Sequence, residues 1–305
     1  MKMLREYITR SELRWRNIVI IVTWHVIGIY GYFTFPYLER KMTFLWFVFT
    51  FVLYSMGLSC GGHRLWAHRS FKAKVPLRLI LAFLFYGSGM YTISQWVRIH
   101  RVHHKYSETE ADPHNSTRGF FYSHMGWALT KPSEECLKRL REIDVSDLKT
   151  DPIIRFGDKH FIVMMLLSSF FIPTIVPIYF WNESWYWAIM SQVFMRYILI
   201  VNAAASVNSI VHRWGTKPYD RNIYPVDSNL ANWISLGEGS HNYHHTFPWD
   251  YKGAEFGKRQ VNLPTFIIEQ CAKIGWAYDL KEPSEKLIRM TYHNRGDGSH
   301  PKLRG

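Results

Sequence analysis

The chain has 305 residues, of which 48% are apolar and 20% charged, and its formal net charge is +13. The length allows one large domain or two small ones, and the three cysteines, which form no C-x-x-C pair, argue against a disulfide framework and a thiolate metal site. The positive charge would suit nucleic acid, but no recognition motif accompanies it, so membrane lipid and an acidic, phosphate-bearing substrate are better partners.

The apolar residues are gathered into runs that approach the thickness of a bilayer. Two uncharged runs occupy 18–36 and 43–60, and a second pair occupies 161–180 and 185–207. Arg196 interrupts the last run and must face protein or water. The sequence therefore predicts four transmembrane helices.

A further apolar stretch, 77–97, contains glycines, hydroxyl-bearing residues and Gln95, and it leads directly into a histidine cluster. We expect this stretch to be buried or to lie at the membrane interface. A fifth membrane span is the alternative.

The distribution of basic residues predicts the orientation of the chain in the membrane. Five basic residues precede the first span, namely Lys2, Arg5, Arg10, Arg14 and Arg16, whereas the WNES turn between the third and fourth spans has no basic residue. Both termini are then cytosolic, and no cleavable signal peptide is evident, so the first span should act as the anchor. The sequence predicts an all-α integral membrane protein whose cytosolic helical cap is formed by 61–160 and 208–305. The tail after about Glu282 is expected to be the only loosely held part.

Nine of the fifteen histidines fall into a pattern at the predicted cytosolic boundary. HRLWAH follows the second span, HRVHH and HNYHH share the spacing H-x-x-H-H, and NSIVH extends from the fourth span. Each H-x-x-H-H can aim three ring nitrogens at one small volume, because positions i, i+3 and i+4 lie along one stripe of a helix. Nine imidazoles exceed the coordination shell of one metal, so two ions are predicted. The candidate ligands are His63, His68, His100, His103, His104, His212, His241, His244 and His245.

Two details of this pattern leave alternatives open. His63 and His68 are separated by about 140° around an α-helix, so they should reach two different ions, or one ion from a fraying helix end. Asn208 lies four residues before His212 and could contact a metal directly, contact it through water, or only hydrogen-bond within the bundle. The absence of thiolates argues against structural zinc. The isolated His25, His160, His293 and His300 are expected on the surface or hydrogen-bonded in the core.

The motifs HRLWAH, HRVHH, ETEADPHN, RGFFYSHMGW, NSIVH, KPYDRNI, GEGSHNYHHTFPWDY and GDGSH occur in that order and resemble those of the membrane-bound acyl-CoA desaturases, in particular stearoyl-CoA-type and insect enzymes. The resemblance implies a single fatty acid desaturase domain over 1–305 and a di-iron centre where four membrane helices meet the cap. It implies that the nine histidines bind iron and that Asn208 acts through a water. It also implies residence in the endoplasmic reticulum membrane, with cytochrome b5 and its reductase as the electron donor.

The implied reaction inserts a cis double bond into a saturated long-chain acyl-CoA, with O2 as co-substrate and no bound organic cofactor. Δ9 is the expected bond position, and Δ11 or another position is the alternative. Iron fits this chemistry because, unlike zinc, it can change its oxidation state. A shell of imidazoles leaves the metals strongly positive, so nearby carboxylates should offset that charge. Glu108, Asp112 and Glu238 are the candidates.

The bond position must come from the shape of a bent apolar tunnel, because the methylenes of a saturated chain offer no polar handle. The resemblance implies that Trp96 lines the bend and that Phe51 and Ser55 close the far end. Met90 and Ala204 stand where related enzymes usually carry a glutamine and a threonine, which puts the bond position in doubt.

The coenzyme A end of the substrate carries phosphates and should meet cations at the cytosolic mouth of the tunnel. Arg98, Arg101 and Lys131 are the candidates for this contact.

Two other functions use similar residues. A membrane di-iron lipid hydroxylase would retain oxygen in its product, but the spacing in HRLWAH and the context HNYHHTFPWDY favour desaturation. A metal transporter would need ionisable residues within the spans, and apart from His25 and Arg196 these carry almost none.

Overall fold

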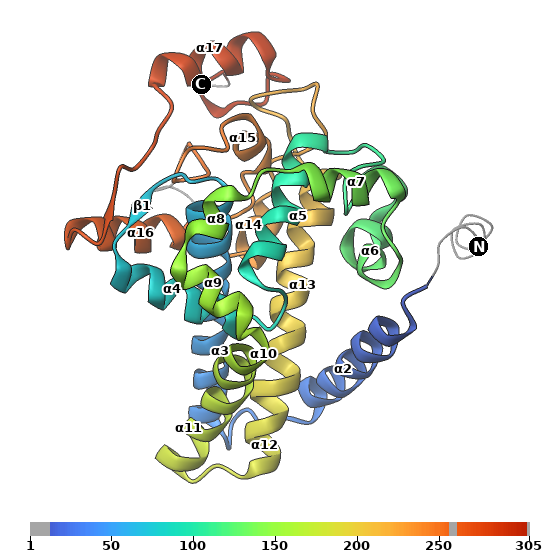
Figure 1. Ribbon diagram of the computed structural model, residues 1–305, viewed down its shortest axis with the longest axis vertical. Helices are drawn as coiled ribbons and strands as arrows, with labels where there is room; N and C mark the ends of the chain where they lie inside the picture. Colours follow the sequence, from blue (N-terminus) through green and yellow to red (C-terminus); the bar gives the residue numbers. More distant parts are fainter. Residues whose placement is uncertain (1–12, 256–260, 304–305) are drawn as a thin grey trace.

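The computed structural model describes residues 13–255 and 261–303 (Figure 1). Of the five basic residues on which the predicted orientation depends, Lys2, Arg5 and Arg10 lie outside the described residues, as do both ends of the chain, whereas Arg14 and Arg16 lie at the start of the first helix. Within the described part, four helices are long and apolar enough to cross a membrane, which confirms the predicted number. They are Trp15–Thr34, Lys41–Ala67, Phe161–Trp181 and Trp185–His212.

Three of these four helices contain π-helical turns. The first of the four helices is α2 (Trp15–Thr34), which is α-helical throughout. The second helix consists of α3 (Lys41–Met56) and the π-helix η1 (Gly57–Ala67). The third consists of α10 (Phe161–Met165), η4 (Leu166–Phe171) and α11 (Ile172–Trp181). The fourth consists of α12 (Trp185–Ile189), η5 (Met190–Met195), α13 (Arg196–Ser209) and the 3-10 turn η6 (Ile210–His212).

The second and fourth helices continue beyond the apolar runs that predicted them. The second helix ends at Ala67 rather than at residue 60, and the fourth ends at His212 rather than at residue 207. Their extensions carry His63 and His212 beyond the apolar runs toward the cap. Gly57 allows η1 to pack closely against the neighbouring helix, because a Cβ at this position would lie 2.3 Å from the backbone carbonyl carbon of Leu84.

The apolar stretch 77–97 forms two short helices, α4 (Val75–Gly87) and α5 (Ile93–Tyr106), rather than a fifth span. Gly89 breaks the stretch with a φ of +72°, a conformation that glycine adopts without strain. The 13 residues of α4 are too few to cross a bilayer, and the helix exposes Leu79 and Ile80 while it buries Phe85. The stretch is therefore partly buried and does not form a fifth span, which agrees with the first of the predicted alternatives.

Short helices and turns form the cap, shown above the spans in Figure 1. One two-stranded sheet departs from the all-α prediction within the described residues: β1 (Lys72–Ala73) pairs antiparallel with β2 (Ala277–Tyr278). The remaining elements are η2 (Ser116–Arg118), η3 (Tyr122–Gly126), α6 (Trp127–Leu129), α7 (Glu134–Glu142), α8 (Ser146–Thr150), α9 (Pro152–Lys159), α14 (Asn229–Ile234), α15 (His241–Thr246), α16 (Leu263–Lys273), α17 (Glu285–Arg295) and η7 (Pro301–Leu303).

The main hydrophobic core lies where η1, α4, α5 and α16 meet. Leu81, Phe85, Val97 and Ile268 are all buried in it. Two histidine-bearing elements, η1 and α5, are thereby held against the same packed centre, which limits the movement of their side chains.

Arg196 faces protein, as the sequence predicts. Its guanidinium is fully buried, lies over the ring of Tyr54 at 4.6 Å, and donates to the carbonyl oxygens of Gly87 at 3.1 Å and Gln192 at 3.0 Å. Carbonyl groups therefore solvate this charge within the bundle.

The prediction of a loosely held C-terminal tail is wrong. The residues after Glu282 form α17 and η7, and Ile288, Tyr292 and His300 are buried, the last with 0% exposure. Ile288 and Tyr292 are four residues apart and therefore share one face of α17. The polar composition of the tail conceals this face and the contacts that its side chains make with distant residues.

Candidate metal centre and cavity

The nine candidate histidines come together between the spans and the cap, from four places in the chain. His63 lies in η1 and His68 directly follows it, His212 ends the fourth span, and the two H-x-x-H-H motifs lie on α5 and α15. Among the described residues they divide into two groups, in each of which one nitrogen from every ring lies within 4.8 Å of the others.

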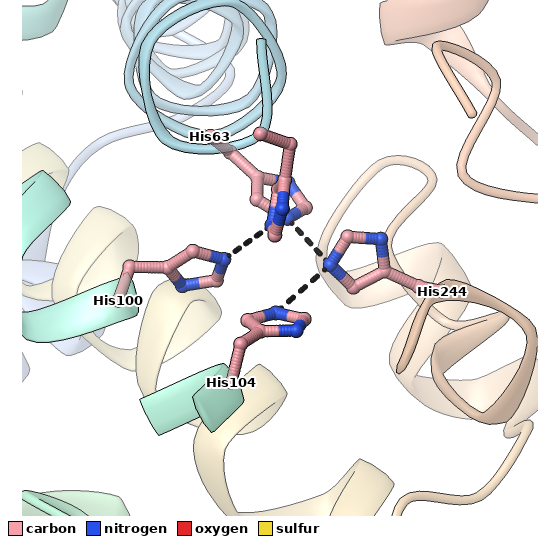
Figure 2. A group of neighbouring side chains, drawn as sticks. His63, His100, His104 and His244 are labelled. Carbon is pink, nitrogen blue, oxygen red and sulfur yellow. Dashed lines mark hydrogen bonds between the residues drawn. The ribbon is translucent and has the colours of Figure 1, made fainter. Parts of the chain in front are cut away.

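The larger group, called the five-histidine group below, contains His63, His68, His100, His104 and His244. Figure 2 shows four of these rings pointing toward a common centre from η1, α5 and α15. The Nε2 atoms of His63 and His244 lie 2.9 Å apart, those of His68 and His100 lie 2.7 Å apart, and those of His104 and His244 lie 3.1 Å apart. The ring nitrogens therefore converge on one small volume.

The smaller group, called the four-histidine group below, contains His103, His212, His241 and His245. The Nε2 of His241 lies 3.0 Å from that of His212 and 3.1 Å from that of His245. The rings of His104, from the five-histidine group, and His245, from the four-histidine group, stack with their centroids 4.0 Å apart. The two groups are therefore direct neighbours.

Each H-x-x-H-H motif contributes to both groups, so the prediction that all three of its rings share one volume is wrong. On α5, His100 and His104 belong to the five-histidine group and His103 to the other. On α15 the assignment is reversed, with His244 in the five-histidine group and the flanking pair in the other. Neighbouring residues point about 100° apart on an α-helix, and this angle separates the rings at i+3 and i+4.

His63 and His68 belong to the same group, so the predicted alternative of two different ions is wrong, whereas the alternative of one ion reached at a helix end agrees with the position of His68 directly after η1. The backbone N–H of His68 donates to the carbonyl of His63 at 3.0 Å, which is the i to i+5 bond of a π-helix. In this wider turn, residues five apart lie one above the other.

Burial keeps most of these imidazoles neutral. Desolvation, followed by the proximity of other histidines, lowers the pKa of His68, His100, His104, His241, His244 and His245. Each neutral ring offers one nitrogen lone pair. Hydrogen bonds need a proton between every two facing nitrogens, whereas one cation accepts several lone pairs at once. The donor set therefore fits a metal ion that binds imidazole.

Three carboxylates contact the far side of the ligand rings, at the residues that the sequence indicated. The Nδ1 of His212 donates to Glu108 at 2.6 Å, and that of His103 donates to Asp112 at 3.0 Å. The Nδ1 of His63 lies 3.2 Å from Glu238. A proton on Nδ1 leaves the lone pair on Nε2, which is the nitrogen that faces the group.

The electrostatics of these pairs follow from their burial. Desolvation alone would raise the pKa of the Glu238 carboxyl, but Arg64, 3.0 Å away, and His63 hold it well below its usual range. Desolvation lowers the pKa of His103, but Asp112 outweighs this effect and raises it overall. The carboxylates therefore place negative charge beside the groups that would hold cations.

A cavity of about 120 Å³ borders both histidine groups. Its lining includes His63 and His100 from one group and His103 and His241 from the other. Four of the five residues predicted to shape the substrate tunnel also line it, as does Asn208; the four are Ser55, Met90, Trp96 and Ala204. Phe51, the fifth, packs against the main core instead and is not among the described lining residues.

Trp96 connects the cavity to the five-histidine group. Its ring stacks on His100, with centroids 4.9 Å apart and an interplanar angle of 12°. Most of the remaining wall is apolar, and it includes Ile99, Ile200 and Val207. The cavity therefore offers an apolar surface at the point where the two groups face it.

The cations predicted to contact coenzyme A, Arg98, Arg101 and Lys131, are not among the described residues that line this cavity. Arg98 donates to the carbonyl of Leu140 at 2.7 Å, and Arg101 pairs with Asp147 at 2.7 Å. Arg101 also lines an open hollow in the cap together with His68, whereas Lys131 is exposed.

Two buried residues at the site, His114 and Arg64, were not among the candidates selected from the sequence. His114 lines the cavity, and its ring lies 4.4 Å from that of His103; its signal was its place in ETEADPHN, two residues after Asp112. Arg64, in HRLWAH, is 1% exposed and donates to the carbonyl of Tyr251 at 2.8 Å as well as to Glu238.

Comparison with known proteins gives consistent matches over most of the chain. The fatty acid desaturase family model matches residues 41–280. The chain is 42% identical to an acyl-CoA Delta(11) desaturase of Spodoptera littoralis over 95% of its own length and 86% of that protein. It is 43% identical to an acyl-CoA Delta-9 desaturase of Acheta domesticus, over 95% and 81% of the two chains. It is also 43% identical to an acyl-CoA Delta-12 desaturase of Tribolium castaneum, over 93% and 80%.

Proposed function

We propose that this chain, which belongs to the fatty acid desaturase family, is an oxygen-dependent acyl-CoA desaturase that inserts a cis double bond into a saturated long-chain acyl-CoA. The observation that carries the proposal is the pair of histidine groups that border one apolar cavity. This arrangement can hold two metals beside a chain that has no polar handle.

The donor sets support two iron ions. The five-histidine group would hold one ion, and the four-histidine group, with Asn208 acting through a water, would hold the other. When bound, iron would supply the redox chemistry by which O2, two electrons and two protons remove two hydrogens from adjacent methylenes, leaving an alkene and two waters.

The side chains of the protein orient the substrate and exclude water. The apolar wall at Ile99, Ile200 and Val207 favours an alkyl chain over water, and Trp96 fixes the wall relative to His100. The Glu108 and Asp112 carboxylates hold the protons on Nδ1 of their histidine partners, so that Nε2 faces inward. The oxidation is thereby limited to methylenes that lie at the junction of the two groups.

The same cavity would also determine the position of the double bond. Three relatives named for three different positions are 42–43% identical to the chain, so overall similarity does not select among those positions. We propose Δ9, with Met90, Trp96 and Ala204 as the residues that set it, because all three line the cavity beside the metal groups.

The proposed setting is the endoplasmic reticulum membrane, with both termini cytosolic and with cytochrome b5 and its reductase as the electron source. Four membrane-length helices and the gathering of the histidines at one end of them support this setting.

The decisive experiment is expression in a host that lacks its own desaturase, with mass-spectrometric location of the double bonds in the host's fatty acids. The wild-type chain should restore cis monoenes at one main position. H244A should abolish them, because it removes a ring that faces both His63 and His104. H160A is the matched control, since His160 is exposed and distant in sequence from the site, and it should retain activity.

A hydroxylated product without an alkene would overturn the desaturase assignment in favour of a lipid hydroxylase. Alkenes at Δ11 or another position would leave the reaction type intact and reject the proposed Δ9 position.

A further inference from the structure

The helix α15 carries three of the nine candidate ligands, yet it has only six residues. Isolated helices shorter than about 12–15 residues are marginally stable in water. The N-cap residue, Ser240, makes no capping hydrogen bond with its own side chain. The positions of His241, His244 and His245 must therefore be fixed by contacts with the rest of the protein.

The segment 217–227 makes many of these contacts. The side-chain oxygen of Asn242 accepts the N–H groups of Tyr219 at 2.8 Å and Asp220 at 3.0 Å. Its amide group donates to the carbonyls of Asp220 at 2.8 Å and Pro225 at 2.9 Å. Since Asn242 lies between His241 and His244 in the chain, the location of 217–227 determines where these rings point.

The C-terminal segment, residues 292–302, in turn holds 217–227. The N–H of Arg221 donates to the carbonyl of Arg295 at 2.9 Å, and the Arg295 side chain pairs with Asp220. Lys217 donates its N–H to the Asp297 carboxylate at 2.7 Å and accepts the N–H of Asp297 at 3.0 Å. Each segment therefore donates one backbone N–H to a backbone carbonyl of the other, and these two hydrogen bonds fix the segments in register.

His300 lies at the centre of this contact. It is fully buried, and its Nε2 lies 2.8 Å from the Glu255 carboxylate, which also accepts the Tyr219 hydroxyl at 2.9 Å. Its ring stacks on Tyr292 at 3.7 Å and meets Tyr219 edge-on at 5.3 Å. The ring of Tyr219 packs in turn against Tyr243 of α15 at 4.8 Å.

We infer that the C-terminal segment is a positioning element for the metal-binding helix α15, with His300 as its anchor, an inference that rests on the proposed metal centre. His300 binds no metal in this role. It acts through Glu255 and Tyr219, and these act through Asn242 and Tyr243. Because α15 serves both histidine groups, the segment determines the geometry of both.

Three substitutions separate the two contacts of His300. H300A removes the hydrogen bond and the ring, H300F keeps a ring against Tyr292 and loses the bond, and H300Q keeps a donor for Glu255 and loses the ring. H293A is the matched control, because His293 lies on the same segment and is exposed. All variants are purified as full chains in detergent.

The measurements are the iron bound per chain, its retention against a chelator, and the absorption spectrum of the protein reloaded with Co²⁺. H300A and H300F should lose metal about 10–100-fold more readily than wild type, as ligand-supporting groups typically do, and should show an altered Co²⁺ spectrum. H300Q should recover most of the metal retention, and H293A should match wild type. Elution as a single species on size exclusion establishes that each variant is folded.

H300A with wild-type metal retention and an unchanged Co²⁺ spectrum would overturn the inference. So would the loss of H300A and H300Q alike from the membrane fraction, because His300 would then serve folding in general. A wild-type chain that binds metal but forms no alkene would reject the proposed function and leave this inference intact, since metal retention is independent of turnover.

Discussion

At the scale of single residues, the position of one proton determines which nitrogen of each histidine can bind a metal. Glu108, Asp112 and Glu238 each contact the Nδ1 of a different ligand ring, although they come from separate parts of the sequence. Glu108 makes the shortest of these contacts, at 2.6 Å to His212. A group that fixes a ligand in this way affects metal affinity without contacting the metal.

We therefore expect E108Q to weaken metal binding and alkene formation by about 10–100-fold, because a neutral amide stabilises the ring of His212 less than a carboxylate does. Iron per purified chain and monoene yield in the deficient host measure the two effects. E110Q is the matched control, since Glu110 is a nearby exposed carboxylate, and it should behave as wild type. Equal iron content in E108Q and wild type would reject this role for Glu108.

At the scale of elements, α15 depends on a buried carboxylate at its start. One oxygen of Asp227 accepts the N–H of Asn242 at 2.8 Å and that of Tyr243 at 3.3 Å. Burial raises the pKa of Asp227 from 3.8 to about 7. The folded chain thus binds this proton more tightly than the unfolded chain, so the stabilisation is complete below about pH 3.8 and is lost as the pH rises through about 7.

D227N stays neutral at every pH, so its stability relative to wild type should be greater at pH 8 than at pH 5, by about 1–2 kcal/mol. The melting temperatures of both proteins in detergent, taken at the two pH values, measure the difference. Because each protein is compared between two pH values, any pH-independent effect of the new amide on hydrogen bonding cancels. D279N is the control, because Lys72 lowers the pKa of the exposed Asp279 and its titration falls below this window. A pH-independent difference for D227N would contradict the prediction.

At the scale of the whole molecule, the histidine groups connect four parts of the chain that are distant in sequence. Metals bound by these groups would link η1, α5, η6 and α15 and would stabilise the folded state over the unfolded one. We expect removal of metal by a chelator to lower the melting temperature by roughly 5–10 °C. Added Fe²⁺ should restore the melting temperature and Mg²⁺ should not, because imidazole is a poor ligand for Mg²⁺. No change on chelation would argue against metal bound at these groups.

The sequence predicted the parts of the molecule better than their assembly. Apolar runs predicted four membrane-length helices, and the histidine spacing selected the rings that the structure gathers. The division of the rings into five and four could not be read from the spacing, because it depends on the π-helical turn between His63 and His68 and on how α5 faces α15. The place of the polar tail was missed for a similar reason, since His300 is buried by contacts with Tyr219 and Glu255, far away in the chain.

The reversed assignment of the two H-x-x-H-H motifs also constrains the distance between the metals. His103 and His104 are consecutive on α5, His244 and His245 are consecutive on α15, and in each pair one ring belongs to each group. Consecutive Cα atoms lie about 3.8 Å apart, so covalent geometry on two helices keeps the two sites adjacent. Metals bound at the two groups would therefore stay close together, because α5 and α15 each supply rings to both groups.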